Sequence, residues 1–379
     1  SATLVISAGG LTNAIGRITR ENKGFINFSS GTREELERQK SIAKKVVNSK
    51  APFYIDGTSA LVLSEIGFLI KIFPYLPNLK VSQSVINLLI KTAKKFKLSN
   101  KTIGYMYYSH GKTIVSSIEK EKSESIYINF VESIKLLESK PENIVSISQT
   151  NKIDCFSEQK VPTELNDACI LAQKENIPIL TEDYLYVKMK QRETKKKAPE
   201  YFSSLILLKI LNEQKKVSFG EYLDYFGYLS SYRFRFLSLN SDDLEKALLG
   251  DRKITNVNIQ NIRKFNFSLI LSEEDGVSFY NALSVLANFL YKILIDDTII
   301  PEIVEKTFIE IIENFPMEKY KNILSHMLIE VCVKKIGKDK PIFILTRTSN
   351  FTEEKIKRLK KALQIFGSKI YYSKTLIRL

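Results

Sequence analysis

Short apolar runs alternate with longer segments of helical character between residues 51 and 185, and this alternation constrains the fold more than any other feature. The apolar runs have strand length and occur at 51–55, 79–81, 143–147 and 177–180. Between them we expect helices at 59–72, 82–97, 127–139 and 162–174, with a hairpin around 109–112. Strands that alternate with helices are typical of a parallel sheet covered by helices. We therefore predict an α/β fold with a central, mostly parallel sheet.

The sequence on both sides of this region predicts additional parts. A helix is expected from about Arg33 to Val47, after a strand-like run at 3–7. Apolar residues recur at helical spacing far downstream, for example at Leu283, Leu286 and Leu290. We predict four parts: an N-terminal α/β segment at 1–49, a central domain at 50–200, a helical region at 201–336 and a strand–helix–strand tail at 337–379.

Composition leaves carboxylates as the main groups for acid, base or metal chemistry. The three cysteines lie far apart and the chain has only two histidines, which excludes a disulfide framework, a cysteine zinc site and a histidine-rich metal centre. A nucleotide-binding α/β protein is disfavoured because neither a G-x-x-x-x-G-K-S/T loop nor a G-x-G-x-x-G loop occurs.

The balance of charge indicates an anionic partner. Lys and Arg number 57 against 42 Asp and Glu, which gives a formal net charge of +15. Nucleic acid is favoured over a membrane, because there is no basic amphipathic anchor and no run of eighteen uncharged apolar residues. A signal peptide is not indicated, so we expect the cytoplasm. The first residue is Ser rather than Met, which leaves open a trimmed chain or a fragment of a longer protein.

Three aspartates occupy positions at which a parallel sheet brings residues together. Asp56 follows the run at 51–55, and Asp183 follows the run at 177–180. The carboxyl ends of parallel strands share one edge, so we expect these two side chains to lie on that edge. Asp167 lies in a predicted helix with Glu164 one turn before it, and it joins them if that helix packs beside the strands.

Clustered carboxylates repel one another unless a cation neutralises them. Mg²⁺ or Mn²⁺, which prefer oxygen ligands, are the expected cofactors. Such ions can activate a water molecule and stabilise the charge that builds on a phosphodiester during in-line displacement. An alternative for Asp56 and Asp183 is that each caps the helical element that follows it, and Glu164 could belong to a solvated helix face.

A basic segment follows Asp183 directly. Residues 188–197 contain one Glu and six basic residues, namely Lys188, Lys190, Arg192, Lys195, Lys196 and Lys197. This position would direct the segment toward the edge of the sheet at which we expect Asp56 and Asp183, which we call the carboxylate edge. There its cations could hold a phosphate backbone. The alternative is a solvated linker without a binding role.

Two motifs resemble the PIN nuclease family. The first is F-Y-I-D-G-T-S-A-L at 53–61, and the second pairs D-A-x-x-x-A at 167–172 with P-I-L-T-E-D at 178–183. The resemblance covers about residues 50–200. The family includes the ribonuclease toxins of bacterial toxin–antitoxin pairs, and its members are α/β/α sandwiches that cut single-stranded RNA with Mg²⁺ or Mn²⁺. It implies that Asp56, Asp167 and Asp183 are metal-binding and catalytic, and that RNA is a more suitable partner than DNA.

One departure from the family pattern leaves the activity open. The family supplies a further Glu on the helix after the second strand, and the matching position here is Asn87. An amide oxygen can bind a cation but brings no charge. Glu65, Glu164 or Glu182 could substitute, or the site could be inactive. The alternative function is thus a PIN-like nucleic-acid-binding or regulatory scaffold, and the helical region could bind a protein partner or a second copy of the chain.

Overall fold

In a computed structural model, the chain divides into two compact units, Ser1–Phe236 and Leu237–Leu379. The structure describes residues 26–27, 33–97, 103–109, 112–118, 120–147, 163–184, 186–187, 199–231, 234–235, 241–250, 259, 276–296, 298–313, 324 and 327. The predicted strand at 3–7, the basic segment at 188–197 and the predicted tail at 337–379 lie outside these residues.

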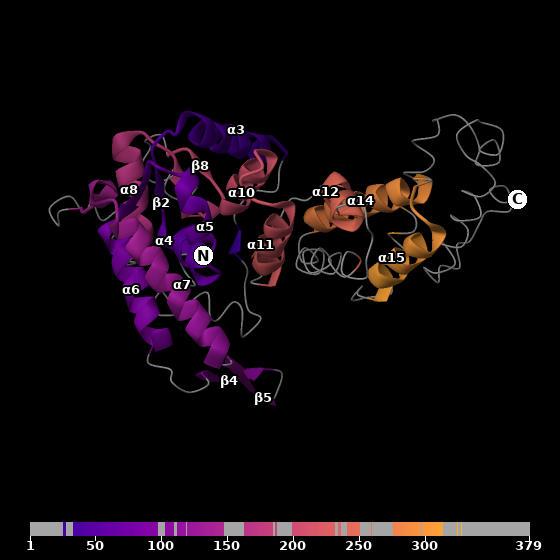
Figure 1. The fold of residues 1–379 in the computed structure, drawn as a ribbon, viewed down its shortest axis with the longest axis horizontal. Helices are drawn as coiled ribbons and strands as arrows, with labels where there is room; N and C mark the ends of the chain where they lie inside the picture. The colour runs from indigo at the N-terminus through magenta and orange to yellow at the C-terminus, as the bar shows by residue number, and fades with distance from the viewer. Residues whose placement is uncertain are drawn as a thin grey trace, which may run out of the picture. The chain divides into compact units, whose positions relative to one another are not determined.

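A five-stranded, all-parallel sheet lies at the centre of the first unit (Figure 1). Its spatial order is β6 (Ile144–Val145), β3 (Leu79–Ser82), β2 (Phe53–Ile55), β7 (Ile179–Leu180) and β8 (Tyr201–Phe202). The central strand β2 is wholly buried, which explains why its sequence is a continuous apolar run rather than an alternating one. The predicted α/β fold is confirmed, and every strand pair in this sheet is parallel.

Helices flank the sheet. In chain order they are α3 (Arg33–Ser49), α4 (Gly57–Glu65), α5 (Phe68–Ile72), α6 (Gln83–Lys97), α7 (Lys120–Glu138), α8 (Thr163–Glu175), α10 (Ser204–Glu213) and α11 (Phe219–Ser231). Short 3₁₀ turns at Phe73–Tyr75 and Pro141–Asn143 precede β3 and β6. Helix α8 packs on β2, β3 and β7, while α3 packs on β8 and on α10.

The stretch at 59–72, which we expected to form one helix, is divided into α4 and α5. Gly67 lies between them with φ of 73°, a left-handed conformation that favours glycine and ends a helix. The Asn129 side chain on α7 donates to the carbonyl oxygen of Glu65 at 3.0 Å and so satisfies a terminal acceptor of α4. No single helix in the described part of the chain is long and apolar enough to cross a membrane, although α4 and 68–75 meet that criterion as a pair bent by 99°.

Residues 201–202, which we expected to be helical, form the edge strand β8. Two residues are too few to show a period-two pattern, and Ser203 caps α10 directly afterwards. Helix α3 is attached to this strand by two side chains. Gln39 accepts the backbone N–H of Ser203 at 3.0 Å, and Glu35 accepts a hydrogen bond from the Tyr201 hydroxyl. The fifth strand thus depends on a helix that precedes the sheet in sequence.

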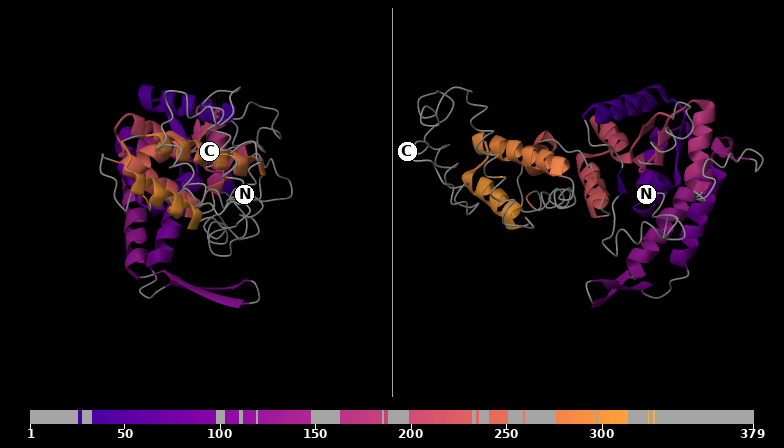
Figure 2. Two further views of the ribbon diagram at one scale, coloured as in Figure 1. Left: turned by 90° about the vertical axis from the view of Figure 1, so that its right-hand side faces the viewer. Right: turned by 180° about the vertical axis from the view of Figure 1, so that it is seen from behind.

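An antiparallel ribbon connects α6 to α7, as the hairpin prediction required. It consists of β4 (Ile103–Ser109) and β5 (Lys112–Ile118), and it lies beyond the ends of the two helices, away from the sheet (Figures 1 and 2). Phe96 and Phe130 stack between α6 and α7 with ring centroids 6.0 Å apart. A second small pairing joins β1 (Ile26–Asn27) to β9 (Phe234–Arg235), and β9 lies where we expected helix.

The described part of the second unit contains α12 (Ser241–Leu249), α14 (Gly276–Ile295) and α15 (Pro301–Glu313). Leu283, Leu286 and Leu290 are buried on α14, as their spacing predicted. Lys292 on α14 forms ion pairs with Asp242 and Glu245 on α12. The prediction of helices after the sheet is confirmed for these segments.

Candidate functional site

The carboxyl ends of β2 and β7 lie side by side and place Asp56 close to Thr181 and Asp183. Ile55 pairs with Leu180, so Asp56 and Thr181 follow at the same level of the sheet. The Thr181 hydroxyl donates to Asp56 Oδ2 at 2.5 Å, and its oxygen accepts the backbone N–H of Asp183 at 3.0 Å. The structure therefore brings Asp56 and Asp183 to one edge of the sheet.

Asp56 is the N-cap of α4. Its Oδ1 accepts the backbone N–H of Ser59 at 2.9 Å and the Thr58 hydroxyl at 2.7 Å. The capping role that we held as an alternative is thus present. Because Oδ2 accepts from Thr181, both carboxylate oxygens have partners and the orientation of the side chain is fixed.

Burial raises the pKa of the Asp56 carboxyl to about 6. Hydrogen bonds from Ser59, Thr181 and Thr58 act in the opposite direction, and the charge of Asp183 raises the pKa further. The two aspartates are thus close enough to repel each other. A bound cation would relieve that repulsion.

Asp183 begins a short helical turn that is attached to α8. Its Oδ1 accepts the backbone N–H of Tyr186 at 3.0 Å, which is again a capping contact. The Tyr186 hydroxyl then donates to Oδ1 of Asn166 at 3.0 Å. Asn166 immediately precedes Asp167 in α8, so this contact joins the segment after β7 to the helix that carries the third predicted aspartate.

The first turn of α8 also lies against the first turn of α4. A Cβ atom on Gly57 would lie 3.2 Å from the carbonyl oxygen of Glu164 and 3.0 Å from Cδ2 of Leu88, so the close approach favours glycine. Asp167 follows Glu164 by one helical turn and is only 8% exposed. The structure therefore positions α8 next to α4, which Asp56 caps, and next to the helical turn that Asp183 begins.

Metal binding by these residues stays a prediction. Within the residues that the structure describes, no group of three or more His, Cys, Asp or Glu side chains is arranged to hold a metal ion. The chemistry of the edge nevertheless fits a hard divalent cation, because its two coupled carboxylates supply oxygen donors. The predicted ligand set remains Asp56, Asp167 and Asp183 with Glu164.

Glu182, one of the candidate substitutes for the missing family glutamate, is a buried carboxylate whose contacts the sequence did not predict. It is fully buried, and its Oε1 accepts the backbone N–H of Ser204 at 2.9 Å and the Ser59 hydroxyl at 3.2 Å. Its Oε2 has no hydrogen-bond partner among the described residues. Burial raises the pKa of Glu182 to about 7, against the effect of the Ser204 hydrogen bonds and with a further increase from Asp56.

Glu182 thereby joins the N-terminus of α4 to that of α10. The run Asp-Gly-Thr-Ser at 56–59 was the only sequence signal for these polar contacts. It predicted the start of a helix rather than a contact with Glu182. The Ser204 contact is formed across 22 positions of sequence, and local pattern carries no information about such a pairing.

The other residues considered for the missing family glutamate lie in different places. Asn87 is exposed on α6 and accepts a hydrogen bond from the Gln83 side chain at 3.2 Å. Glu65 is the last residue of α4, at the opposite end from the Asp56 cap. Glu164 is half-buried beside Gly57, and Glu182 is at the edge itself. Of the three candidate substitutes, Glu65 is thus the one that the fold places away from the edge.

The parallel sheet has the strand order 3-2-1-4-5 in sequence numbering, with aspartates at the carboxyl ends of its first and fourth strands, and it belongs to the α/β class that the PIN resemblance implies. Residues 54–191 match a family model described as the PIN domain associated with the TPR-GreAB-C-PIN system. The chain thus contains a PIN domain with flanking regions on both sides, and PIN domains are typically metal-dependent nucleases. Neither the curated proteins nor the solved structures gave a match.

Proposed function

We propose that this protein is a Mg²⁺- or Mn²⁺-dependent nuclease that hydrolyses phosphodiester bonds in single-stranded RNA. The observation that carries the proposal is the network in which Thr181 connects Asp56 to Asp183 at the carboxyl edge of the sheet. The match of residues 54–191 to a PIN family model supports the same class of chemistry.

In this proposal Asp56 and Asp183 hold the divalent ion, with Asp167 and Glu164 contributed by α8. When bound, the ion would supply a water activated for attack and positive charge to stabilise the phosphate. Thr58, Ser59 and Thr181 hold the Asp56 carboxylate in place through their hydrogen bonds. The contact from Tyr186 to Asn166 holds α8 near the site.

Nucleic acid is the proposed substrate class, and RNA within that class follows from the family resemblance. The net charge of +15 supports an anionic partner. The cations of the segment after β7 are proposed to bind the substrate strand: Lys188, Lys190, Arg192, Lys195, Lys196 and Lys197.

A catalytically inactive scaffold that binds nucleic acid is the second candidate. It is favoured by the neutral Asn87 and by the lack of a preformed cluster of three acidic side chains among the described residues. Such a protein would bind RNA without shortening it.

Cleavage of labelled single-stranded RNA in Mn²⁺ tests the proposal. We expect the wild type to shorten the RNA. Asp167→Asn and Asp183→Asn should each abolish cleavage while leaving the melting temperature of the protein nearly unchanged. Glu142→Gln is the matched control, because Glu142 is exposed at Pro141–Asn143 and loses the same charge.

Full activity in either aspartate variant would refute the assignment of that residue. A wild type that retards RNA on a gel without cutting it would support the scaffold instead. A parallel reaction with DNA of the same sequence tests the choice of RNA.

A further inference from the structure

We infer that the outward face of α6 is a track for the phosphate backbone of single-stranded RNA, leading away from the carboxylate edge. This inference rests on the proposed nuclease function and deepens it, because it places the part of the substrate beyond the bond that is cut. The track consists of Lys91, Lys94 and Lys97, which follow Gln83 and Asn87 along the same helix.

Helix α6 has one buried face and one exposed face. Its buried residues are Val85, Ile86, Leu88, Leu89, Thr92 and Ala93. Gln83, Asn87, Lys91 and Lys94 are exposed, and their spacing of three or four residues places them on one stripe. Lys97 continues the stripe by a further turn and is also exposed. The lysines therefore project from a helix whose position is fixed by its packed face.

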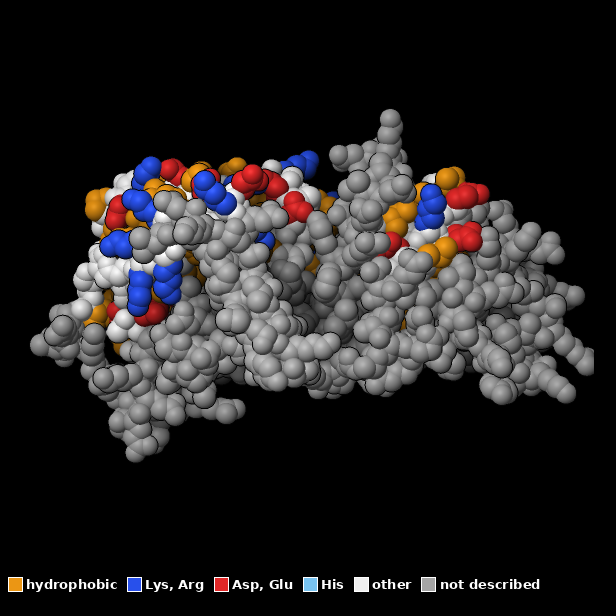
Figure 3. Space-filling view, turned by 90° about the horizontal axis from the view of Figure 1, so that it is seen from below, with side chains coloured by type: hydrophobic (Ala, Val, Ile, Leu, Met, Phe, Trp, Pro, Cys, Tyr) orange, Lys and Arg blue, Asp and Glu red, His pale blue; other side chains and the backbone are white. Residues whose placement is uncertain are grey.

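The charge of this stripe is not neutralised by the residues that the structure describes. The sequence of α6 contains four lysines and neither Asp nor Glu. Lysines elsewhere form ion pairs, as Lys71 does with Glu221 and Lys80 with Glu175. Within the described part of the chain, Lys91, Lys94 and Lys97 form none. Lys and Arg side chains gather on the side of the molecule where α6 and α7 lie (Figure 3).

Stabilisation of the helix dipole is the simplest alternative explanation for lysines near a helix C-terminus. That effect falls off within the last turn. It accounts for Lys94 and Lys97, which the last turn of α6 contains, but Lys91 lies before that turn. A phosphate track accounts for all three.

The helix begins beside the proposed site. Ile55 pairs with Val81, so Asp56 and Ser82 lie at the same level, and α6 starts at the next residue. At about 1.5 Å per residue, Lys91 lies ~12 Å and Lys97 ~21 Å along the helix from Gln83. A stacked strand rises about 3.4 Å along its axis per nucleotide, so about four nucleotides reach Lys91 and about six reach Lys97.

Asn87 acquires a role in this arrangement. A glutamate there would place a negative charge on the stripe between the site and Lys91. The amide instead leaves the exposed face of α6 free of acidic groups over its whole length. The departure from the family pattern thus removes a charge that would repel a phosphate backbone.

The salt dependence of RNA binding by the full chain tests the track. The variant Lys91→Gln/Lys94→Gln/Lys97→Gln is compared with Lys45→Gln/Lys174→Gln/Lys215→Gln, which removes three exposed lysines that lie outside α6. Fluorescence anisotropy with an RNA of about twelve nucleotides is measured in EDTA, so that cleavage does not interfere. The plot of log K against log salt has a negative slope. Loss of three phosphate contacts should make that slope shallower by about 2. Between about 50 and 200 mM salt, the wild type should lose about 20-fold more affinity than the track variant.

The control triple should keep the wild-type slope. Equal slopes in the two triple variants would overturn the track. It would also be overturned if the track substitutions weakened binding of a trinucleotide as much as binding of the longer RNA. Tighter binding of the wild type to anionic vesicles than to RNA would also overturn it. If the track variant unfolds, Lys91→Gln alone serves, with an expected slope change of about 0.7. Failure of the wild type to cut RNA in Mn²⁺ would instead refute the proposed nuclease and leave the binding result to stand by itself.

Discussion

The Thr181 hydroxyl lies between the two aspartates of the carboxylate edge, donating to Asp56 Oδ2 at 2.5 Å and accepting the N–H of Asp183 at 3.0 Å. One side chain therefore sets both the orientation of the first carboxylate and the start of the segment that carries the second. Because all three residues are buried, water cannot replace these bonds.

Replacing Thr181 with valine should destabilise the protein and impair the site together. Valine keeps the shape of the side chain but leaves a buried acceptor and a buried donor without partners, which costs about 1–3 kcal/mol of unfolding free energy. Thr181→Ser retains the hydroxyl and should lose much less. Urea unfolding and Mn²⁺-dependent cleavage are measured for both variants. Equal values for the serine and valine variants would show that the hydroxyl has no such role.

Gly57→Ala should lower stability by about 1–3 kcal/mol because its Cβ would overpack the contact between α4 and α8. The new atom would lie 3.0 Å from Leu88 Cδ2 and 3.2 Å from the Glu164 carbonyl oxygen. Gly220→Ala is the matched control, since nothing lies within 4 Å of a Cβ there. Alanine favours a helix over glycine, so this control should gain up to about 1 kcal/mol. Thermal melts that rank the variants in the reverse order would contradict the close approach.

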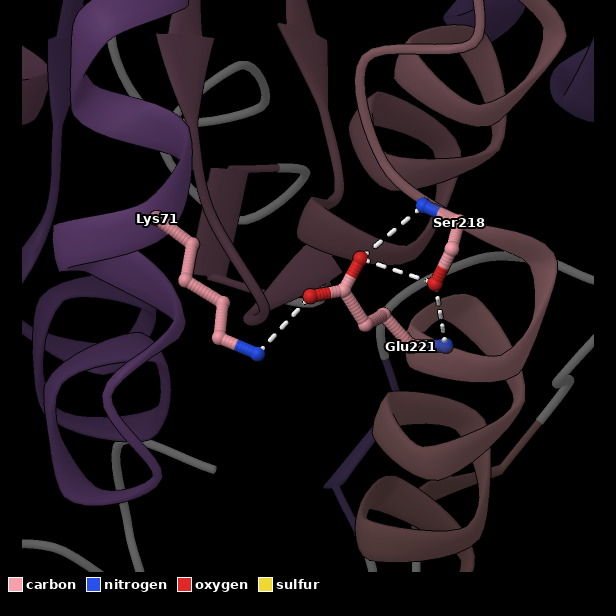
Figure 4. Close-up of polar contacts among 3 residues, drawn as sticks. All are labelled: Lys71, Ser218 and Glu221. Atoms are coloured by element: carbon pink, nitrogen blue, oxygen red, sulfur yellow. Dashed lines mark hydrogen bonds and ion pairs between the residues drawn. The ribbon is translucent and has the colours of Figure 1, made fainter.

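Glu221 holds the start of α11 and connects it to α5 (Figure 4). Its Oε2 accepts the backbone N–H of Ser218 at 2.9 Å, while the Ser218 hydroxyl accepts the N–H of Glu221 at 3.2 Å. This reciprocal pair is a capping box. Lys71 Nζ lies 2.8 Å from Oε1 of the same carboxylate. The Lys71 contact and the Ser218 hydrogen bonds lower the pKa of Glu221 to about 2.

The depressed pKa predicts a dependence of stability on pH. The folded protein favours ionised Glu221, so its contribution is present above the ordinary pKa of 4.5 and is lost as the pH falls toward 2. The side chain is 35% exposed, so solvent screening limits the contribution to about 1 kcal/mol. Urea unfolding of the wild type and Glu221→Gln should differ by this amount at neutral pH and converge in acid. A difference that grows as the pH falls would have the wrong sign.

Glu182→Ala should destabilise the protein by about 2–4 kcal/mol, because the N–H of Ser204 and the hydroxyl of Ser59 would both lose a buried acceptor. Glu182→Gln retains an acceptor oxygen and should lose less. Chemical unfolding of the two variants at one pH measures the difference. Equal losses would mean that the acceptor oxygen kept by glutamine does not matter, and that removal of the carboxylate itself determines the effect.

The sequence predicted the parts of this domain that depend on local pattern. The four longer apolar runs were recognisable as strands, and the Asp56 and Asp183 positions followed from the rule that parallel strands end at one edge. The break at Gly67 was missed because the apolar residues continue on both sides of it. Strand β8 was missed because it is two residues long and its identity depends on pairing with β7.

The polar frame around Asp56 could be foreseen only in part. An aspartate before Gly-Thr-Ser predicts an N-cap, and this is what Ser59 and Thr58 show. The contacts of Glu182 with Ser59 and Ser204 depend on how three separate elements meet. Sequence-based reasoning has no access to such contacts until the topology is known.

The attachment of α3 to β8 determines how this domain could be transferred between proteins. Residues 54–191 delimit the recognisable module, yet Gln39 lies before it, and Ser203 and Ser204 lie after it. A fragment cut at those limits would lack an edge strand and the amide that Glu182 binds. A minimal unit for expression or for fusion to another protein should therefore begin before α3 and extend through α11.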